Sequence, residues 1–386
     1  MKELFDWLAR LAALEGQTPQ QGPPVHEHLH RLFAPSPLDF DWSIVRIVDA
    51  DQEAYSFGRV PGRLSVLVWP DAGVQPNPLS DQAIAAQLGA ILTLATNRRL
   101  EVAASDMPLT MEGTSQHVFL PTNLLLDRSL GGPIDGDPKA LLEGTIGVLY
   151  GLAELDREII GAAIELHYAA ALLFDVEPNA AYALAIAGLE RLSRAYGEPP
   201  TEWSAWEHAT RFDRVFSDIG LTEGQANRLR DELLHDRQMR LRQTFARYVT
   251  DNLPTDFWEL KLEDFIPTLT MAPDGSGTFS GMVRQAPVPI TRLVPSDPHI
   301  LRSRLLGSYD ARSSYVHDGR RRPVMSATLT QLVGNEPRSS EPIEFAGIRA
   351  ILRTLVVAEA QKRSQPRPLP GLRLTHAGNA PPEPPE

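Results

Sequence analysis

The sequence predicts an α+β protein, with an N-terminal α+β domain over residues 1–135 and an all-α bundle over residues 136–363. Three observations predict this order. Alternating, β-branched runs lie within residues 42–70 and are typical of strands. Ala- and Leu-rich segments dominate the second part of the chain, which indicates helices buried in a bundle. Residues 364–386 are Pro-rich and charged, so a disordered tail is expected there.

The N-terminal domain is expected to hold two helices separated by strands. Apolar residues at helical spacing predict a helix over residues 2–15. The runs 42–48 and 63–69 alternate and are rich in β-branched residues, which favours strands near glycine turns. Ser80 is expected to cap a helix that continues to about Leu94. No chemical motif falls in these elements, so a sensing or regulatory role is expected for this domain.

The first bundle helices are marked by proline and by long apolar runs. Pro138 at a first helical position predicts a helix to about Leu155. Residues 159–173 and 179–196 predict two more helices, which are apolar on all sides and therefore buried. His167 lies in the first of these two runs. We expect it to be a core histidine with satisfied ring nitrogens.

The rest of the bundle is punctuated by caps and a polar insertion. Ser204 with Glu207 forms a capping-box pattern and predicts a helix start. Thr222 is expected to cap a long Arg-rich helix over residues 222–253. Residues 267–296 are rich in Pro, Gly and Ser, which predicts an inserted loop or hairpin. A last amphipathic helix over residues 343–362 is expected to pack back on the bundle.

Composition excludes several classes of function. The 386-residue chain contains no cysteine, which excludes disulfides, thiolate metal sites and a cysteine nucleophile and fits a reducing cytoplasm. No run of eighteen or more apolar residues is present, so no membrane insertion is expected. The formal net charge is −12, which argues against a protein that coats nucleic acid with its whole surface. Any RNA contact is therefore expected to be local.

One local basic stretch surrounds an Arg-x4-His pair. Residues 300–322 carry six arginines against two aspartates, and include Arg312 and His317. A guanidinium can hold a phosphate, and an imidazole can transfer protons at neutral pH. With ten histidines in an Arg-rich chain, about one such spacing arises by chance. Two are found, and the second, Arg230 with His235, lies in the long charged helix, where a solvated helix face is the simpler interpretation.

The surroundings of Arg312 distinguish the first pair from the second. The run Ser-Tyr-Asp-Ala-Arg-Ser-Ser-Tyr-Val-His-Asp-Gly over residues 308–319 resembles the motif of the HEPN superfamily (higher-eukaryote and prokaryote nucleotide-binding domains), and within it the Apea-like branch. The resemblance includes the apolar helix 184–192, with Glu190 where that branch often carries an acid. It extends over about residues 155–363. Many HEPN members have Asn, Asp or His directly after the arginine, whereas this chain has Ser313.

The resemblance implies a metal-independent endoribonuclease that works without a cofactor. His317 would act as general acid or base, and Arg312 would stabilise the phosphate charge. HEPN nucleases typically pair, so a homodimer or higher homo-oligomer is expected, with RNA as substrate. The same resemblance implies a bacterial toxin or antiphage defence effector, with a regulatory protein or a phage-derived trigger as a further partner. Supporting residues would be Glu190, Ser313, Tyr315, Asp318 and Gly319, and RNA-binding residues Arg302, Arg304, Arg320, Arg321 and Arg322.

Alternatives remain open at the level of residues and of function. Glu190 could orient Arg312 or be an exposed helix acid. Tyr315 could stack on a base or pack in the core. The chain could be a noncatalytic HEPN module that dimerises and binds nucleotide or RNA. A more remote alternative is a zinc metallopeptidase using the His-Glu-x-x-His pattern; the simpler interpretation of that pattern is an exposed short helix. Its residues are His26, Glu27 and His30.

Overall fold

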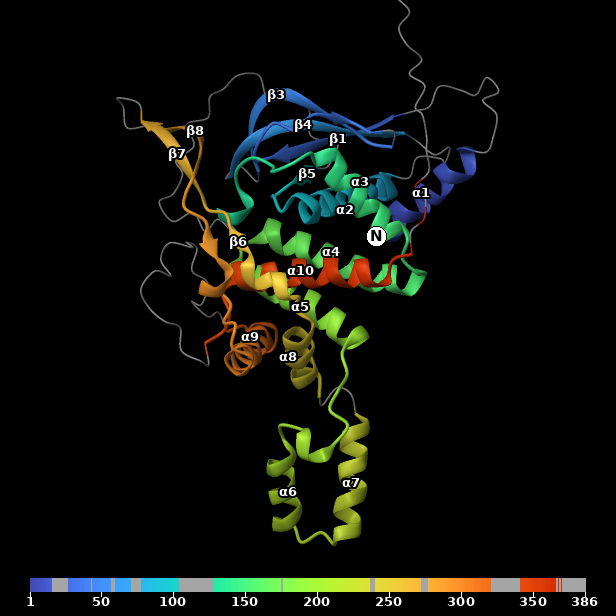
Figure 1. Cartoon of the computed structure of the whole chain (residues 1–386), viewed down its shortest axis with the longest axis vertical. Helices are drawn as coiled ribbons and strands as arrows, with labels where there is room; N and C mark the ends of the chain where they lie inside the picture. Colours follow the sequence, from blue (N-terminus) through green and yellow to red (C-terminus); the bar gives the residue numbers. More distant parts are fainter. Residues whose placement is uncertain are drawn as a thin grey trace, which may run out of the picture.

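A computed structural model confirms the α+β fold class, with a sheet formed early in the chain and helices after it (Figure 1). The sheet and the first two helices form one layer of the molecule. The later helices form a second layer against it, and a pair of helices projects from the far side of that second layer. The structure describes residues 1–15, 27–42, 44–56, 60–70, 78–103, 128–174, 176–236, 240–271, 277–320, 341–365, 367 and 369.

The main sheet is antiparallel and has the strand order β2-β3-β4-β1-β5. Alternation places Leu32, Ile47 and Leu67 on one face, where all three are fully buried. Helices α1 and α2 lie beneath that face (Figure 1). The elements are α1 (Lys2–Glu15), β1 (Glu27–Ala34), β2 (Phe40–Asp41), β3 (Arg46–Ser56), β4 (Val60–Pro70), α2 (Pro78–Thr96) and β5 (Glu101–Ala103).

The helical layer confirms a bundle, with one break that the sequence did not predict. The segment expected as one helix from Pro138 ends at Tyr150, and a new helix begins at Glu154 after Ala153 adopts an extended backbone conformation. The body helices are α3 (Pro138–Tyr150), α4 (Glu154–Leu173), α5 (Pro178–Tyr196), α8 (Leu241–Asn252), α9 (Pro298–Asp318) and α10 (Phe345–Arg363).

Helix α10 lies at the centre of the packing. Its apolar residues Ile348, Ile351, Leu352, Leu355 and Val356 are fully buried. At its start, the Phe345 ring stacks on Phe174 at the end of α4, with ring centroids 4.1 Å apart. One hydrophobic core extends from α1 through α10. The two predicted domains therefore share a core.

The inserted segment forms short strands and 3-10 turns. Strands β7 (Phe265–Met271) and β8 (Gly277–Arg284) make an antiparallel hairpin. It projects beside the main sheet (Figure 1). Smaller elements flank it: η4 (Thr255–Glu259), β6 (Lys261–Leu262), β9 (Val288–Pro289) and η5 (Ile290–Arg292), with η1 (Arg128–Leu130) preceding α3.

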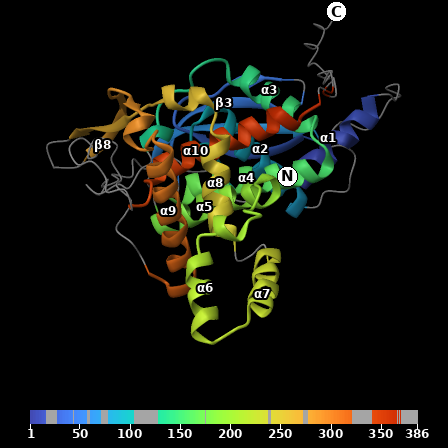
Figure 2. The ribbon, with the colours of Figure 1, turned by 60° about the horizontal axis from the view of Figure 1, so that its bottom comes forward.

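A helical arm, defined here as residues 201–236, projects from the body (Figures 1 and 2). It contains η2 (Trp203–Ala205), α6 (Ala209–Asp218) and α7 (Glu223–His235). The capping box predicted at Ser204 and Glu207 is wrong, because Ser204 lies within the 3-10 turn η2, Glu207 follows that turn, and α6 begins only at Ala209. The cap at Thr222 is confirmed, with Gln225 completing its capping box.

The helix predicted over residues 222–253 is wrong in its length. Helix α7 ends when Asp236 turns to an extended conformation, and α8 starts afresh at Leu241. The buried Arg240 anchors the new helix start, because its guanidinium donates to the carbonyl of Pro200. This break separates the arm from the body. Among the described residues, no helix has both the length and the apolar character that a bilayer span requires.

Candidate functional site

Helix α9 carries the Arg-x4-His pair on its last two turns. Asp297 caps its start by accepting hydrogen bonds from the backbone N–H groups of His299 (2.9 Å) and Ile300 (3.0 Å). Gly319 ends it in the left-handed conformation, with φ 65°, which glycine adopts without steric cost. His317 therefore lies in the last turn of the helix, near the negative end of the helix dipole.

Arg312 contacts Glu190 of α5, which is the pairing that the sequence left open. The distance from Arg312 Nη2 to Glu190 Oε2 is 3.5 Å. Glu190 is only 5% exposed, and burial raises the pKa of its carboxyl, while Arg312 and Arg194 act in the opposite direction. The pair fixes the position of the guanidinium against α5, since a buried carboxylate requires a cationic partner.

Each member of this pair keeps one unused polar atom. Among the described residues, Glu190 Oε1 and Arg312 Nε are buried without a hydrogen-bond partner. The Arg312 side chain is 23% exposed. Arg312 is therefore anchored by one nitrogen and retains exposed donor surface that an anion can reach.

His317 is exposed, and a single chain does not direct it to the same point as Arg312. On an α-helix the two residues are separated by about 140° around the axis and about 7.5 Å along it. Ser313 and Tyr315 are partly buried between them, and Asp318 and Gly319 are exposed at the helix end. A site that uses both groups on one phosphate therefore needs the reach of the arginine or a second copy of the helix.

An arginine that sequence reasoning counted only as charge holds α9 in place. Arg242 of α8 makes a bidentate contact with Asp310, with both N–O distances 2.8 Å. Its third nitrogen donates to Glu207, at the base of the arm, at 2.5 Å. Arg242 thus connects three elements: α8, α9 and the arm. No sequence signal distinguishes it from the neighbouring arginines.

The predicted RNA-binding arginines have different environments. Arg302 and Arg320 are exposed. The prediction for Arg304 is wrong, because this side chain is 4% exposed and its guanidinium donates to the carbonyls of Glu341 (3.0 Å) and Pro342 (3.1 Å). Arg304 instead fixes the start of α10. Arg321 and Arg322 lie outside the described residues.

The metallopeptidase alternative is contradicted by the secondary structure. Glu27 and His30 lie on strand β1, not on a helix, and His26 lies outside the described residues. His30 is buried and stacks on Trp69, with ring centroids 4.5 Å apart. Over the part of the chain that the structure describes, no cluster of three metal-ligating side chains is found.

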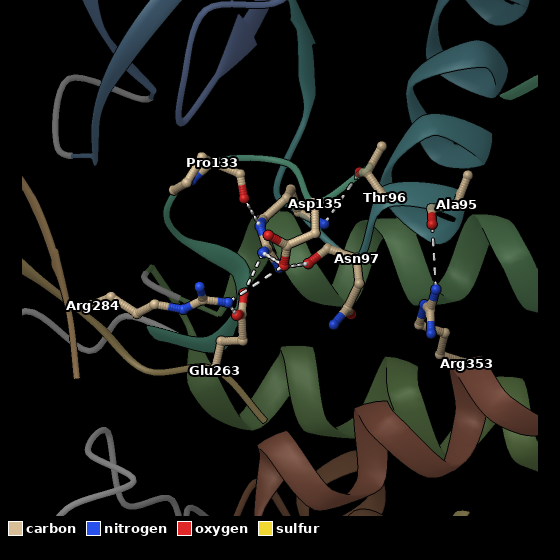
Figure 3. Close-up of polar contacts among 9 residues, drawn as sticks. Ala95, Thr96, Asn97, Pro133, Asp135, Glu263, Arg284 and Arg353 are labelled. Carbon is tan, nitrogen blue, oxygen red and sulfur yellow. Dashed lines mark hydrogen bonds and ion pairs between the residues drawn. The ribbon is translucent and has the colours of Figure 1, made fainter. Parts of the chain in front are cut away.

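A buried arginine cluster, which the sequence did not indicate, joins the sheet layer to the helical layer. Arg353 of α10 donates to the last carbonyls of α2, Leu94 at 2.8 Å and Ala95 at 3.3 Å (Figure 3). Burial, with the nearby Arg349 and Arg98, lowers the pKa of Arg353 to about 10. Helix C-terminal carbonyls carry partial negative charge, so they stabilise a cation held out of water.

Two further arginines complete this cluster. Arg349 is fully buried and donates to Asn97 Oδ1 at 2.8 Å and Ser129 Oγ at 2.6 Å. Arg98 donates to the carbonyl of Pro133 at 2.7 Å. Around it, Asp135 and Glu263 form ion pairs with Arg98 and Arg284 (Figure 3).

His167 lies near the same cluster. The prediction of a core position is confirmed, since His167 is fully buried. The prediction of satisfied ring nitrogens is wrong, because neither has a hydrogen-bond partner among the described residues. Burial, then Arg349 and Arg353, holds its pKa well below the usual range, so the ring is neutral.

Comparison with protein-family models, with curated proteins and with solved structures finds no match for this chain. The HEPN resemblance therefore rests on the α9 motif and on the helix that carries Glu190.

Proposed function

We propose that this chain is a metal-independent endoribonuclease in which Arg312 and His317 act on one phosphodiester. One observation carries the proposal. Arg312 forms an ion pair with the buried Glu190 at 3.5 Å and lies five residues before an exposed histidine in the last turn of the same helix. Cleavage of RNA by this route requires a fixed cation and an accessible proton-transfer group, and this helix carries both. The resemblance adds the biological setting, a bacterial toxin or antiphage effector.

The proposed reaction is an internal transfer at phosphorus. The ribose 2′-oxygen forms a bond to phosphorus while the bond to the 5′-oxygen of the next nucleotide breaks. A base removes the 2′-hydroxyl proton, and an acid protonates the departing 5′-oxygen. The products are a 2′,3′-cyclic phosphate and a 5′-hydroxyl, so the step consumes no water. His317 takes one of the two proton-transfer roles, worth about 10²- to 10⁴-fold in rate.

Arg312 has a separate role in this scheme. Charge accumulates on the non-bridging phosphate oxygens as the new bond forms, and a guanidinium can contact two such oxygens. Because Glu190 already orients the guanidinium, little ordering is needed when the phosphate binds. The second proton-transfer group would come from His317 of a second copy, as the pairing of HEPN nucleases implies.

The test uses single variants and product analysis. Purified His317→Ala should lose RNA cleavage by at least about 100-fold, and Arg312→Ala by a similar factor. His235→Ala is the matched control, because it removes the histidine of the other Arg-x4-His pair, which is exposed on the arm. Its cleavage should equal that of the wild type. Undiminished cleavage by His317→Ala, or products with a 3′-hydroxyl, would overturn the proposal.

A second candidate is a noncatalytic module that binds nucleotide or RNA. The ion pair of Arg312 with Glu190 favours it, because Glu190 offsets part of the Arg312 charge and the remaining charge is sufficient to bind an anion. It predicts no cleavage of any RNA in a panel by the wild type, together with RNA binding that Arg312→Ala removes. Detection of cyclic-phosphate products separates the two candidates.

A further inference from the structure

The helical arm, residues 201–236, carries three of the large apolar residues that are exposed in the described chain. Val215 is 43% exposed and Ile219, directly after α6, is 64% exposed; Leu229 of α7 is 41% exposed. The three side chains are borne by an element that projects away from the body (Figures 1 and 2). Exposed apolar groups gathered on one projection indicate an interaction surface.

The arm has only a small core of its own. Trp206 and Phe216 are buried within it, and the rings of Trp206 and Phe212 stack at 5.2 Å. Helices α6 and α7 have 10 and 13 residues, lengths at which isolated helices are marginal in water. One ion pair between the helices, Asp213 with Arg230 at 2.9 Å, adds to this core. Further packing from outside would stabilise the arm.

An exposed arginine on α6 and an exposed glutamate on α7 each lie about one turn from an exposed apolar residue of the same helix. Arg211 lies one turn before Val215 on α6, and Glu232 lies three residues after Leu229 on α7. Both charged side chains are exposed, and neither has an ion-pair partner among the described residues. A surface that carries both signs in this way can complement a second copy of itself.

We propose that the arm is a homodimer interface, in which α6 of one copy packs antiparallel against α7 of the other. The register follows from the spacing. When Val215 meets Leu229 of the second copy, a step of about 6 Å toward the start of α6 reaches Arg211, and a step of about 4.5 Å toward the end of α7 reaches Glu232. In an antiparallel pair these two steps have the same direction. Each dimer would thus contain the apolar contact and the ion pair twice.

This pairing would produce a four-helix bundle with its twofold axis along the arm. Neighbouring helices alternate in direction around that axis, which needs only the hairpin already present in each copy. The two bodies would then lie side by side at the same end of the bundle. Helix α9 lies on the side of the body from which the arm projects (Figures 1 and 2), so both copies of the motif helix would face the same region.

Disulfide trapping tests the contact directly, since the chain has no cysteine. Val215→Cys and Leu229→Cys are purified separately, mixed and oxidised. We expect a cross-linked dimer in the mixture, well above the level in either variant alone. A mixture of Ser217→Cys and Leu229→Cys is the control, because Ser217 is exposed on the opposite side of α6. Equal cross-linking in both mixtures would overturn the proposed register.

Charge reversal tests the same interface without cysteines. Light scattering should give twice the chain mass for the wild type. Arg211→Glu alone, or Glu232→Arg alone, should weaken dimerisation by about tenfold or more, and the double variant should restore it. A monomeric wild type at 100 µM or so, or a double variant no better than the single ones, would overturn the proposal. None of these measurements uses RNA, so their failure is distinct from failure of the nuclease proposal.

Discussion

At the scale of single residues, two glutamates, Glu190 buried and Glu344 partly buried, show that neighbouring charges oppose or add to the effect of burial on a pKa. Burial raises the pKa of both Glu190 and Glu344. Glu190 has two opposing arginines, one of which forms the candidate site. Glu344, at the start of α10, has its pKa raised to about 7 by burial, with Arg304 opposing and Glu341 adding to the shift. The Glu190 carboxyl positions Arg312. The Glu344 carboxyl instead destabilises the fold when it ionises as the pH rises.

Replacement of Glu344 should change how stability depends on pH. Its pKa in the folded protein, about 7, lies above that of an unfolded glutamate, so the folded state binds more protons between about pH 4.5 and 7. Ionisation of this group therefore reduces stability as the pH rises through that window. Glu344→Gln should be more stable than the wild type at pH 8 by about 1 to 2 kcal/mol. At pH 5 the difference should be smaller.

Urea unfolding at both pH values measures this effect. Glu143→Gln is the control, because Glu143 is exposed on α3, away from Glu344 in the sequence. The unfolding free energy of the control should follow that of the wild type at both pH values. An equal gain for Glu344→Gln at pH 5 and pH 8 would contradict the assignment.

At the scale of elements, the end of α10 is fastened across the junction of α3 and α4. Ser364 Oγ donates to the carbonyl of Val148 at 2.7 Å, and the N–H of Gln365 donates to the carbonyl of Gly151 at 3.0 Å. A Cβ on Gly151 would lie 2.3 Å from the Gln365 carbonyl oxygen. The junction therefore needs glycine because of close approach, not because of its backbone angles.

Two glycine-to-alanine variants test this contact. Gly151→Ala should destabilise the protein by about 1 to 3 kcal/mol, because the collision displaces the fastened segment. Gly144→Ala in α3 should stabilise it by up to about 1 kcal/mol, since a Cβ there meets nothing within 4 Å and alanine is the better helix former. Denaturant unfolding gives both values. Equal effects of the two substitutions would rule out a close approach at Gly151.

Element types were predictable where the apolar pattern is long and regular. The helices around residues 2–15, 159–173 and 343–362 follow from helical spacing, and the structure confirms them. Strand β1 was not predicted because it contains part of the His-Glu-x-x-His pattern, and that pattern is typical of a helix. The break between α7 and α8 was missed because residues 236–240 contain neither proline nor glycine. Its cause is a tertiary contact made by Arg240.

The candidate site was predictable only in part, for the same reason. The motif indicated Arg312, whereas its contact with Glu190 was one of two alternatives, and the packing of α5 against α9 decides between them. Arg302 and Arg304 lie two residues apart in one basic run, yet one is exposed and the other buried. Net charge along the sequence cannot separate them, because the burial of Arg304 depends on carbonyls contributed by residues 341 and 342.

At the scale of the whole molecule, Arg349 joins the two layers. Its side chain on α10 bonds to Asn97 and Ser129, both in the N-terminal part. Arg349→Met should destabilise the fold by about 2 to 4 kcal/mol, because it leaves buried polar partners unsatisfied. Tryptophan fluorescence and far-UV circular dichroism should still report one transition, since the layers share a core.

Arg302→Met is the matched control for that variant. Arg302 is exposed on α9, so its replacement should change the unfolding free energy by less than about 0.5 kcal/mol. Two separate transitions in the wild type would show that the sheet layer and the helical layer unfold independently, contrary to the packing described.

The central position of α10 also affects how the chain folds on the ribosome. The residues that complete the core, 345–363, are translated after every other helix of the body. Until they emerge, α4 and α5 lack the apolar partner that buries them, and nascent chains with exposed apolar surface recruit chaperones or aggregate. The body would therefore close only late in synthesis. A growing polypeptide would then present the Arg312 helix on a compact scaffold only after residues 345–363 have been translated.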